Sequence, residues 1–475
     1  MLIAHTLKYL PAQLLSPAAQ VISMILWTHW LAPTEMGLFT LVTVTQEVAF
    51  IACLGWFSVY TLRYLPSDND FVARQRYLDT ENVIVLASVG GSLLSALATT
   101  AVLYPLNGLW LTTLEIGLFF VTRSLNTHYA ERARAQSAFL AYTLLQTAGP
   151  VGGLGLGLLA FQYVDASALV LLAVYSVAQG LGLLFALPLL GMQWRLSMPD
   201  RILLKVALAF GAPMLGLHAL AWAAENYIRY LVQWTAGAAA LGLMIVGWSL
   251  GRRCAAVASM LVATAAFPLA SRLFNEGRRD EALAQLSVNA ALLLAVLVPV
   301  TVAVELLGAT LVALVVAPEY RESTTAILSL SMLGGMLRNL HLHVTDQVMV
   351  LELQLKQVGV VGVVEIVASI VASLLGLAFF GLEGAVIGQA LGSLLTLGLS
   401  LYWVQLRHGF VWPWSETIRI LLATSAMALA IVWVGREPTL DGLLIDTATG
   451  MVSYALALSL LFFRELRQAL PARVH

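Results

Sequence analysis

Five arginine residues lie inside long apolar stretches of this sequence: Arg123, Arg229, Arg252, Arg253 and Arg338. A charged side chain at the centre of a membrane costs at least about 2.5–3.5 kcal/mol, so it faces protein or water and usually has a function. A guanidinium binds phosphate through two parallel hydrogen bonds. Five arginines with almost no lysine beside them therefore favour phosphate recognition, whereas a site for organic cations needs carboxylates and aromatic rings.

Arg338 begins a polar stripe on an otherwise apolar helix. His341 and Thr345 follow at helical spacings of three and seven residues, and Asp346 flanks the same face. Such a stripe must point inward, where it lines a cavity or, alternatively, forms a buried structural network. We expect Arg338 and His341 to contact substrate and Asp346 to take part in ion coupling.

Arg252 and Arg253 are adjacent, so their side chains point about 100° apart on a helix. One of the two is expected to face a cavity, and the other to pair with Glu225 or with a carboxylate on another helix. Arg123 has Asn126 one turn away and lies nearer the cytoplasmic end of its span. It is a further substrate-binding candidate, although its side chain could instead reach the membrane surface.

The stretch "AENYIRYLVQW", residues 223–233, places Glu225, Asn226 and Arg229 within about one helical turn. Glu225 and Arg229 have the favourable order and spacing for an ion pair within one helix. We expect Asn226 and Arg229 to bind substrate and Glu225 to take part in ion coupling. The alternative is a polar patch at the membrane interface that satisfies itself.

Two carboxylates lie within spans apart from these groups. Glu47 has Thr43 and Thr40 on its helix face, whereas Glu365 has no polar stripe. A carboxylate at this depth is a candidate for reversible protonation. Glu47 is the expected coupling residue, and Glu365 is expected to be structural.

The composition fixes the protein class. Of the 475 residues, 60% are hydrophobic and only 11% are charged, against about 25% charged in soluble domains. Apolar runs long enough to cross a bilayer follow one another along the chain, and in lipid they must be helices. The sequence thus predicts an all-α polytopic membrane protein with about 14 transmembrane helices, at residues 8–30, 38–62, 81–104, 109–131, 138–161, 166–190, 204–234, 239–270, 285–315, 323–350, 357–380, 384–405, 416–434 and 443–463.

The distribution of Lys and Arg predicts the orientation. Only Arg321 and Arg436 fall on one side of the predicted spans, and the five arginines named first fall within them. The other 18 of the 25 Lys and Arg residues fall on the side that holds both termini. Both termini are therefore expected in the cytoplasm. An alternative register that places Arg252 and Arg253 in a loop is rejected, because it would invert every later loop.

Two similar segments suggest an internal duplication. "WLAPTEMGLFTLV" follows the first predicted span and "WTAGAAALGLMIV" follows the seventh, each with a Gly before the next helix, Gly37 and Gly242. Six spans separate the two copies, which predicts two parallel six-helix lobes around a central cavity plus a C-terminal helix pair. The expected divisions are residues 1–195, residues 196–406 and residues 407–475, the last with a cytoplasmic tail.

Four short motifs, in this order and spacing, resemble the polysaccharide-transporter family, the Wzx-type flippases of the multidrug/oligosaccharidyl-lipid/polysaccharide exporter superfamily. They are Glu35-Met36-Gly37, Phe267-Pro268 with Arg272, Pro318-Glu319-Tyr320, and Gly384-Ala385-Val386-Ile387. Met36 departs from the tyrosine usual at its position. The resemblance implies two lobes, alternating access and export of a lipid-linked sugar.

The function expected is therefore that of a flippase for an undecaprenyl-diphosphate-linked oligosaccharide in the bacterial inner membrane, serving O-antigen or exopolysaccharide synthesis. The alternatives are an ion-coupled multidrug exporter of the same fold and a non-catalytic membrane subunit of a polysaccharide export complex. The partners expected are the lipid-linked oligosaccharide, membrane lipids, H⁺ or Na⁺, and a polysaccharide polymerase or export protein. No nucleic-acid partner, cofactor, catalytic residue or metal site is expected, because the sequence carries no Walker loop, metal-ligand spacing or nucleophile elbow.

Overall fold

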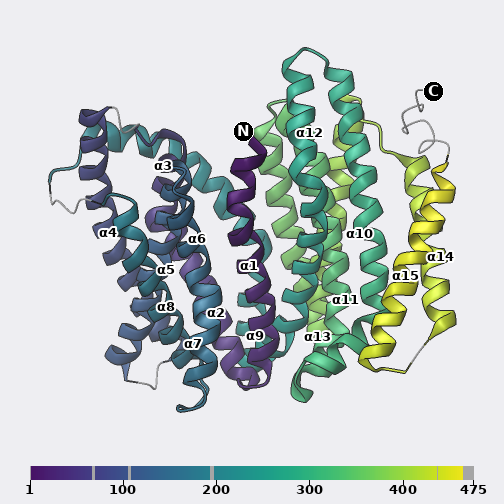
Figure 1. The fold of residues 1–475 in the computed structure, drawn as a ribbon, viewed down its shortest axis with the longest axis horizontal. Coiled ribbons are helices and arrows are strands. Elements are labelled where there is room, and N and C mark those ends of the chain that lie inside the picture. Colours follow the sequence, from purple (N-terminus) through teal and green to yellow (C-terminus); the bar gives the residue numbers. More distant parts are fainter. Residues whose placement is uncertain (1, 67–69, 105–107, 193–196, 436, 464–475) are drawn as a thin grey trace. The chain divides into compact units, whose positions relative to one another are not determined.

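The computed structural model describes residues 2–66, 70–104, 108–192, 197–435 and 437–463. Side chains are described for the same residues except 2–12, 261 and 263–266. Within these ranges the chain is helical and contains no strand (Figure 1).

The first half of the chain forms eight α-helices and the beginning of a ninth. Two π-helical turns, η1 (Ile51–Gly55) and η2 (Ala148–Gly152), continue α2 into α3 and α6 into α7 without a break. The helices are α1 (Leu2–Thr28), α2 (Pro33–Phe50), α3 (Trp56–Tyr64), α4 (Phe71–Leu103), α5 (Leu109–Ala135), α6 (Phe139–Thr147), α7 (Gly153–Ala160), α8 (Ala168–Leu189) and α9 (Arg201–Asn275).

The second half continues with α10 (Arg279–Val315), α11 (Pro318–Leu340), α12 (Asp346–Leu351), α13 (Leu355–His408), α14 (Trp414–Val434) and α15 (Leu440–Leu461). A third π-helical turn, η3 (His341–Thr345), joins α11 to α12. The long helices α9 and α13 are each interrupted by a non-helical glycine, Gly237 (φ 86°) and Gly381 (φ 63°). A positive φ costs glycine little, which explains its use at both breaks.

These elements correspond to the predicted spans. Counting the π-joined helices once and the interrupted helices twice gives fourteen helical segments in the described residues, one for each predicted span. Nine continuous helical stretches in this part of the chain are long and apolar enough to cross a membrane. Arg252 and Arg253 lie within a helix, so the rejected register with both residues in a loop does not occur.

Local sequence signals account for several helix starts. Pro33 and Pro318 occupy the first turns of α2 and α11, where proline needs no hydrogen-bond partner. Ser167 caps α8 by accepting a hydrogen bond from the Val170 amide (3.3 Å). Glu35 also accepts a hydrogen bond from the Ala168 amide (2.7 Å), which places a carboxylate at the positive end of α8.

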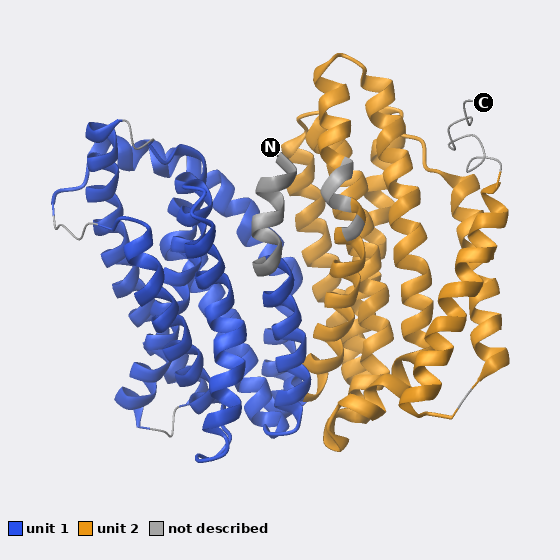
Figure 2. Ribbon diagram, viewed as in Figure 1, with its two compact units in different colours: residues 1–242 blue, residues 243–475 orange. Residues whose placement is uncertain are grey.

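Two compact units divide the chain, residues 1–242 (unit 1) and residues 243–475 (unit 2) (Figure 2). The border falls within α9. In unit 1, α5 packs against α4 and α8, and α1 packs along α6. In unit 2, α11 packs against α13 and α10, and α14 and α15 pack together. The division predicted at residues 195/196 and 406/407 stays a prediction.

Glycines allow three close contacts between helical segments. A side chain on Gly384 would overlap the carbonyl of Gly376, and one on Gly392 would overlap Ser369, so the two parts of α13 lie against each other on either side of Gly381. A side chain on Gly37 would likewise overlap the carbonyl of Ala238. Small residues permit such contacts between membrane helices, where packing takes the place of the hydrophobic effect.

The exposed surface is largely apolar, as a lipid environment requires. Leu94, Phe379 and Trp433 are 70%, 75% and 89% exposed. Soluble proteins rarely expose large apolar patches, so this surface indicates contact with lipid.

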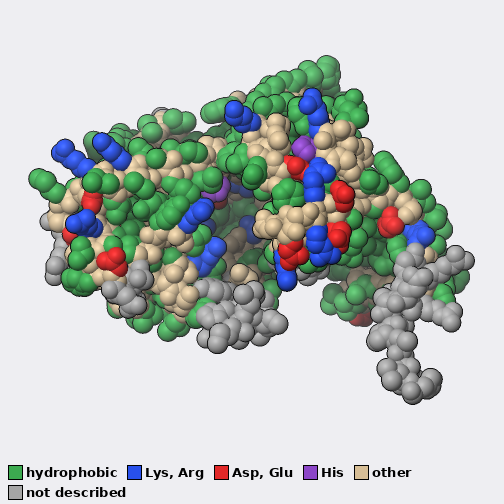
Figure 3. Space-filling model, turned by 90° about the horizontal axis from the view of Figure 1, so that it is seen from above, with side chains coloured by type: hydrophobic (Ala, Val, Ile, Leu, Met, Phe, Trp, Pro, Cys, Tyr) green, Lys and Arg blue, Asp and Glu red, His purple; other side chains and the backbone are tan. Residues whose placement is uncertain are grey.

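Charged side chains gather on the end of the molecule shown in Figure 3. In unit 2, charged pairs surround the α9–α10 connection, including Arg272–Glu276 (2.9 Å) and the close contact Arg278–Glu281. Hydrogen bonds and ion pairs with Arg272 and Arg278 hold the pKa of the Glu276 carboxyl below its usual value.

Candidate functional site

Arg338 forms a buried ion pair that the sequence did not predict. Its Nη1 lies 2.5 Å from Oε1 of Glu365, which comes from α13, and both side chains are less than 10% exposed. Ser393 Oγ lies 3.5 Å from the same carboxylate oxygen. The two parts of α13 therefore supply a carboxylate and a hydroxyl to an arginine on α11. Because an unpaired charge here is costly, each member makes the other tolerable.

The polar stripe that follows Arg338 lies in the π-helical turn η3. His341 Nδ1 is 2.9 Å from Thr345 Oγ1 and 3.2 Å from Ser400 Oγ, and Ser400 donates to Thr345 (2.9 Å). His341 Nε2 lies 3.4 Å from Asp346 Oδ1. The predicted stripe is thus present as a network of the His341 imidazole with the Thr345 and Ser400 hydroxyl groups, and the Asp346 carboxylate lies beside it. π-Helical turns of this kind are frequent at functional sites.

Arg252 lies on α9 and is 8% exposed. Its guanidinium carbon stands 5.7 Å from the centre of the Trp248 ring, an arrangement that favours the cation. Trp248 is held by a hydrogen bond from its Nε1 to Gln389 Oε1 (2.7 Å). A Cβ on Gly335 of α11 would stand 2.7 Å from the Ala255 Cβ of α9 and 3.7 Å from the Arg252 side chain. The glycine therefore lets α9 approach α11 closely, which brings Arg252 within about one helical turn of Arg338.

Arg253 is half-buried, whereas Arg252 is buried, as expected for adjacent positions on different helix faces. Their roles in substrate binding stay predictions. The contact between α9 and α11 in unit 2 nevertheless brings the Arg252 side chain close to the turn that carries Arg338, although 86 residues of sequence separate them.

In unit 1, Glu47 is exposed in the last turn of α2, about one helical turn before the π-helical turn η1. Its Oε2 accepts a hydrogen bond from Nε1 of Trp222 on α9 (3.0 Å). Two residues earlier, Thr45 is hydrogen-bonded to the hydroxyl of Tyr230 (2.9 Å). This part of α2 therefore contacts α9 at Trp222 and Tyr230, beside and within the segment 223–233. An exposed carboxylate at this point of an apolar helix needs water or a polar ligand.

Asn226 is buried and donates to the carbonyl of Trp222 (3.0 Å), while Glu225 and Arg229 are half-buried. All three lie on the part of α9 that approaches Glu47. The predicted Glu225–Arg229 pair stays a prediction. The Asn226 amide is hydrogen-bonded within its own helix. To bind a substrate, it would have to give up that hydrogen bond.

Arg123 on α5 lies next to the second π-helical turn. A Cβ on Gly149 of η2 would stand 3.7 Å from Arg123 Nη1 and 3.0 Å from Gln179 Nε2. Gln179 in turn accepts from Thr122 (3.1 Å). Arg123 is half-buried beside the contact of α5 with α6 and α8. Its role in substrate binding stays a prediction.

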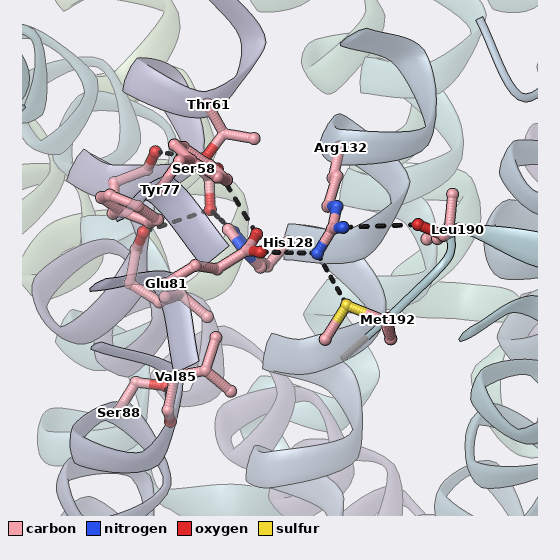
Figure 4. A network of polar contacts seen from close by, with 12 residues as sticks. Ser58, Thr61, Tyr77, Glu81, Val85, Ser88, His128, Arg132, Leu190 and Met192 are labelled. Carbon is pink, nitrogen blue, oxygen red and sulfur yellow. Dashed lines mark hydrogen bonds and ion pairs between the residues drawn. The ribbon is translucent and has the colours of Figure 1, made fainter. Parts of the chain in front are cut away.

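Sequence analysis overlooked a second buried charged network, in unit 1 (Figure 4). Glu81 on α4 bonds two side chains of α5, Arg132 at 2.5 Å and His128 at 3.0 Å, and all three side chains are completely buried. His128 Nδ1 also lies 2.8 Å from Ser58 Oγ, so α3 joins the network. Arg132 further donates to the Leu190 carbonyl (3.3 Å). The network fastens three helices and the end of α8 to one another.

Arg132 is one of the 18 basic residues predicted on the cytoplasmic side, and Glu81 begins a predicted span. The structure shows that Arg132 is buried inside the α4–α5–α8 contact. A signal was available, because His128 and Arg132 are four residues apart on one helix face and two polar groups at this spacing can share a carboxylate.

No group of three or more His, Cys, Asp or Glu residues in the described ranges is arranged to hold a metal ion. Each of the three π-helical turns lies beside a charged or titratable residue inside a span: Glu47 before η1, Arg123 beside η2 and His341 within η3. The arrangement offers cations, carboxylates and hydroxyl groups for binding.

A family model described as "Polysaccharide biosynthesis protein" matches residues 80–325, just over half of the chain. No curated protein matches this chain. Among solved structures, the chain is similar to "Lipid II flippase MurJ, inward closed conformation", with a TM-score of 0.64 and 13% identity over 98% of this chain and 99% of the other. It is also similar to an inward-facing multidrug resistance MATE family transporter of the MOP superfamily, with a TM-score of 0.56 and 14% identity over 82% of this chain and 94% of the other. These similarities show a shared transporter fold and confirm the predicted all-α polytopic membrane architecture.

Proposed function

Because the chain belongs to the polysaccharide biosynthesis protein family, we propose that it is a flippase for a lipid-linked oligosaccharide. It would carry an undecaprenyl-diphosphate-linked sugar across the bacterial inner membrane by alternating access, for O-antigen or exopolysaccharide synthesis. Both termini would lie in the cytoplasm, and the protein would perform no covalent chemistry. The flippase and transporter names of the solved structures of the same fold agree with this proposal.

The observation that carries the proposal is the arrangement of arginines in unit 2. Arg252 lies against Gly335, one helical turn from Arg338, and half-buried Arg253 follows it. The planar guanidinium group can donate two parallel hydrogen bonds to the charged oxygens of a diphosphate. Glu365 pairs with Arg338, and a diphosphate would compete for the same donor.

Ion coupling would use carboxylates in both units. Glu47 accepts a hydrogen bond from Trp222, and its side chain is exposed, so it can reach water or an ion. In unit 2, Asp346 lies 3.4 Å from His341 and could exchange a proton with it. We propose Glu47, Asp346 and Glu225 as coupling groups for H⁺ or Na⁺.

The test is transport of the lipid-linked sugar itself. The purified protein is placed in vesicles whose inner leaflet holds an undecaprenyl-diphosphate-linked oligosaccharide, and a glycosidase added outside measures the sugar that crosses. The protein should accelerate exposure of the sugar, and Arg338→Lys should retain part of this rate, since lysine keeps the charge and loses the planar geometry. Equal rates with and without protein would contradict the proposal.

A second candidate function is export of organic cations, the alternative that the sequence left open. One observation favours it: the exposed carboxylate of Glu47 lies beside the aromatic rings of Trp222 and Tyr230. Aromatic faces and a carboxylate attract cations. In the same vesicles, movement of an organic cation driven by a proton gradient, without movement of the lipid-linked sugar, would favour this candidate.

A further inference from the structure

Gln389, in the second part of α13, has a buried amide group that is only half used. The side chain is 3% exposed, and its Oε1 accepts the hydrogen bond from Trp248 Nε1 (2.7 Å). An indole N–H can only donate, so the amide oxygen must face the ring and the NH₂ group must point away from it. This NH₂ group is buried as well and makes no hydrogen bond with any residue that the structure describes.

The stability of unit 2 does not account for this amide. A buried donor without a partner is destabilising, whereas replacing both partners of a hydrogen bond by apolar groups of similar shape can be nearly neutral. A leucine at Gln389 and a phenylalanine at Trp248 would fill the same space without that cost. What the amide supplies is its oxygen, which fixes the Trp248 ring. The reason for the Gln389–Trp248 pair therefore lies in where it places the ring.

The Trp248 side chain is held at both ends. The residue is 2% exposed, and its backbone carbonyl accepts a hydrogen bond from Ser331 Oγ on α11 (2.7 Å). Its ring nitrogen is bonded to Gln389 on α13. A tryptophan side chain turns about only two bonds. The indole therefore cannot change its orientation in this packing without losing the bond to α13.

Arg252 is the group that the ring contacts. It follows Trp248 by four residues, so both side chains lie on the same face of α9. The guanidinium carbon stands 5.7 Å from the ring centre, within the range of an attractive cation–π contact. The attraction acts on the charge of the guanidinium and does not require its N–H groups, in contrast to the Arg338–Glu365 pair.

Two adjacent glycines on α11 make this arrangement possible. A Cβ on Gly334 would stand 3.4 Å from the Cβ of Ala390, the residue after Gln389. A Cβ on Gly335 would stand 2.7 Å from the Cβ of Ala255 on α9. The glycines therefore let α13 and α9 both lie close to α11, as small residues do between membrane helices. An amide on α13 can then reach an indole on α9.

We propose that Gln389 and Trp248 are positioning residues for Arg252. The amide oxygen fixes the indole, and the indole holds the guanidinium in the place where it meets the diphosphate of the substrate. Neither residue has to touch the substrate, since a side chain that is already ordered loses less freedom on binding. The inference rests on the proposed function, because it explains how Arg252 is directed at the diphosphate.

The first measurement needs no substrate. Full-length protein labelled with 5-fluorotryptophan is held in lipid nanodiscs, and Trp248→Phe identifies the fluorine NMR signal of Trp248. Gln389→Leu should shift this signal, because the ring loses its hydrogen bond. Thr396→Val is the matched control and should leave it unchanged. Thr396 is buried two turns further along α13, and its hydroxyl bonds the Gly392 carbonyl of its own helix (2.8 Å). An unchanged signal in Gln389→Leu would overturn the inference.

The second measurement is equilibrium binding of radiolabelled undecaprenyl diphosphate, without sugar, to the same nanodiscs. Gln389→Leu should weaken binding about fivefold, the order of effect of a lost buried cation–π contact, and Thr396→Val should not change it. In protein that already carries Arg252→Ala, Gln389→Leu should have no further effect, because the pair acts only through Arg252. The same fivefold loss in that background would overturn the inference.

A third comparison separates positioning from stability. Gln389→Leu alone leaves the indole N–H of Trp248 buried without an acceptor, so its Tm should fall. Adding Trp248→Phe removes that donor and should restore most of the Tm. Binding of undecaprenyl diphosphate should stay weak in this joint variant, because no hydrogen bond fixes the phenylalanine ring. Recovery of binding together with Tm would show that the pair serves stability alone, and the inference would be wrong.

The vesicle assay distinguishes this inference from its premise. If the parent protein moves the lipid-linked sugar but Gln389→Leu binds undecaprenyl diphosphate as the parent does, the flippase stands and the inference is wrong. If the parent moves no sugar but its binding of undecaprenyl diphosphate depends on Gln389 through Arg252, the positioning role stands and the proposed function is wrong. A parent protein that does not bind undecaprenyl diphosphate would overturn the inference, since Arg252 would then have no diphosphate to meet.

Discussion

The Arg338–Glu365 pair offers the sharpest test of whether a buried charge serves structure or substrate. Arg338→Ala leaves the Glu365 carboxylate buried without its arginine. At the 2.5 Å separation, Coulomb's law with an effective dielectric constant of about 20 gives roughly 7 kcal/mol of attraction. Desolvation of both groups offsets part of it, and removal of one partner of a buried pair costs about 3–5 kcal/mol. On the scale of soluble domains of 150–250 residues, this corresponds to a fall in Tm of about 6–20 °C.

The assay compares thermal unfolding and transport in four variants. Arg338→Ala and Glu365→Gln should both lower Tm, and the joint replacement Arg338→Met with Glu365→Leu should restore most of it, since both charges are removed together. Arg321→Ala is the matched control, because Arg321 is an exposed arginine on the same helix, bonded to the Val316 carbonyl. Arg321→Ala should change the free energy of unfolding by no more than about 0.5 kcal/mol.

Transport then separates the two roles. If Arg338 binds the diphosphate, the joint variant should recover most of the parent's stability and remain inactive. If the pair is only structural, the joint variant should recover both stability and transport. The electrostatic reasoning itself would be refuted by an unchanged Tm in Arg338→Ala, because a stranded buried carboxylate cannot be free of cost.

The remaining predictions concern unit 1. Arg132→Ala should lower Tm by an amount similar to Arg338→Ala, since it strands a completely buried Glu81; an unchanged melting curve would show that water reaches this network. Gly37→Ala should destabilise the protein because its Cβ would overlap the Ala238 carbonyl, whereas Gly90→Ala, which has open space around it, should be neutral or stabilising by up to about 1 kcal/mol; equal melting temperatures would contradict the close contact. Glu47→Gln should make transport insensitive to an imposed proton gradient, because the amide cannot exchange a proton, and an unchanged pH profile of the vesicle assay would remove Glu47 as a coupling group.

The sequence alone determined the protein class, the helical segments and the positions of their breaks. Apolar runs must form helices in lipid, because every backbone group needs a partner, so composition and run length were sufficient. The placement of Arg252 and Arg253 inside a helix also followed from the sequence, since the charge bias rejected any register with both residues in a loop.

Spacing along one helix predicted local groups but not their partners. The stripe Arg338–His341–Thr345 was visible at helical period, and the structure shows His341 bonded to Thr345 within it. Glu365 was read as an isolated structural acid, although it is the ion-pair partner of Arg338. No local pattern links two residues on different helices, because their proximity depends on how α11 packs against α13.

Only the tertiary structure decided which charges share a site. Glu81 and Arg132 are 51 residues apart and seemed to lie at the ends of spans, yet the packing of α4 on α5 buries them together. An apolar groove of about 350 Å³ beside Tyr230 depends in the same way on three segments, α2, α4 and α9, that are far apart in sequence. Periodicity gives the face that a residue occupies on its own helix. The neighbour that covers this face is set by side-chain packing across the whole unit, through contacts that are non-local in sequence.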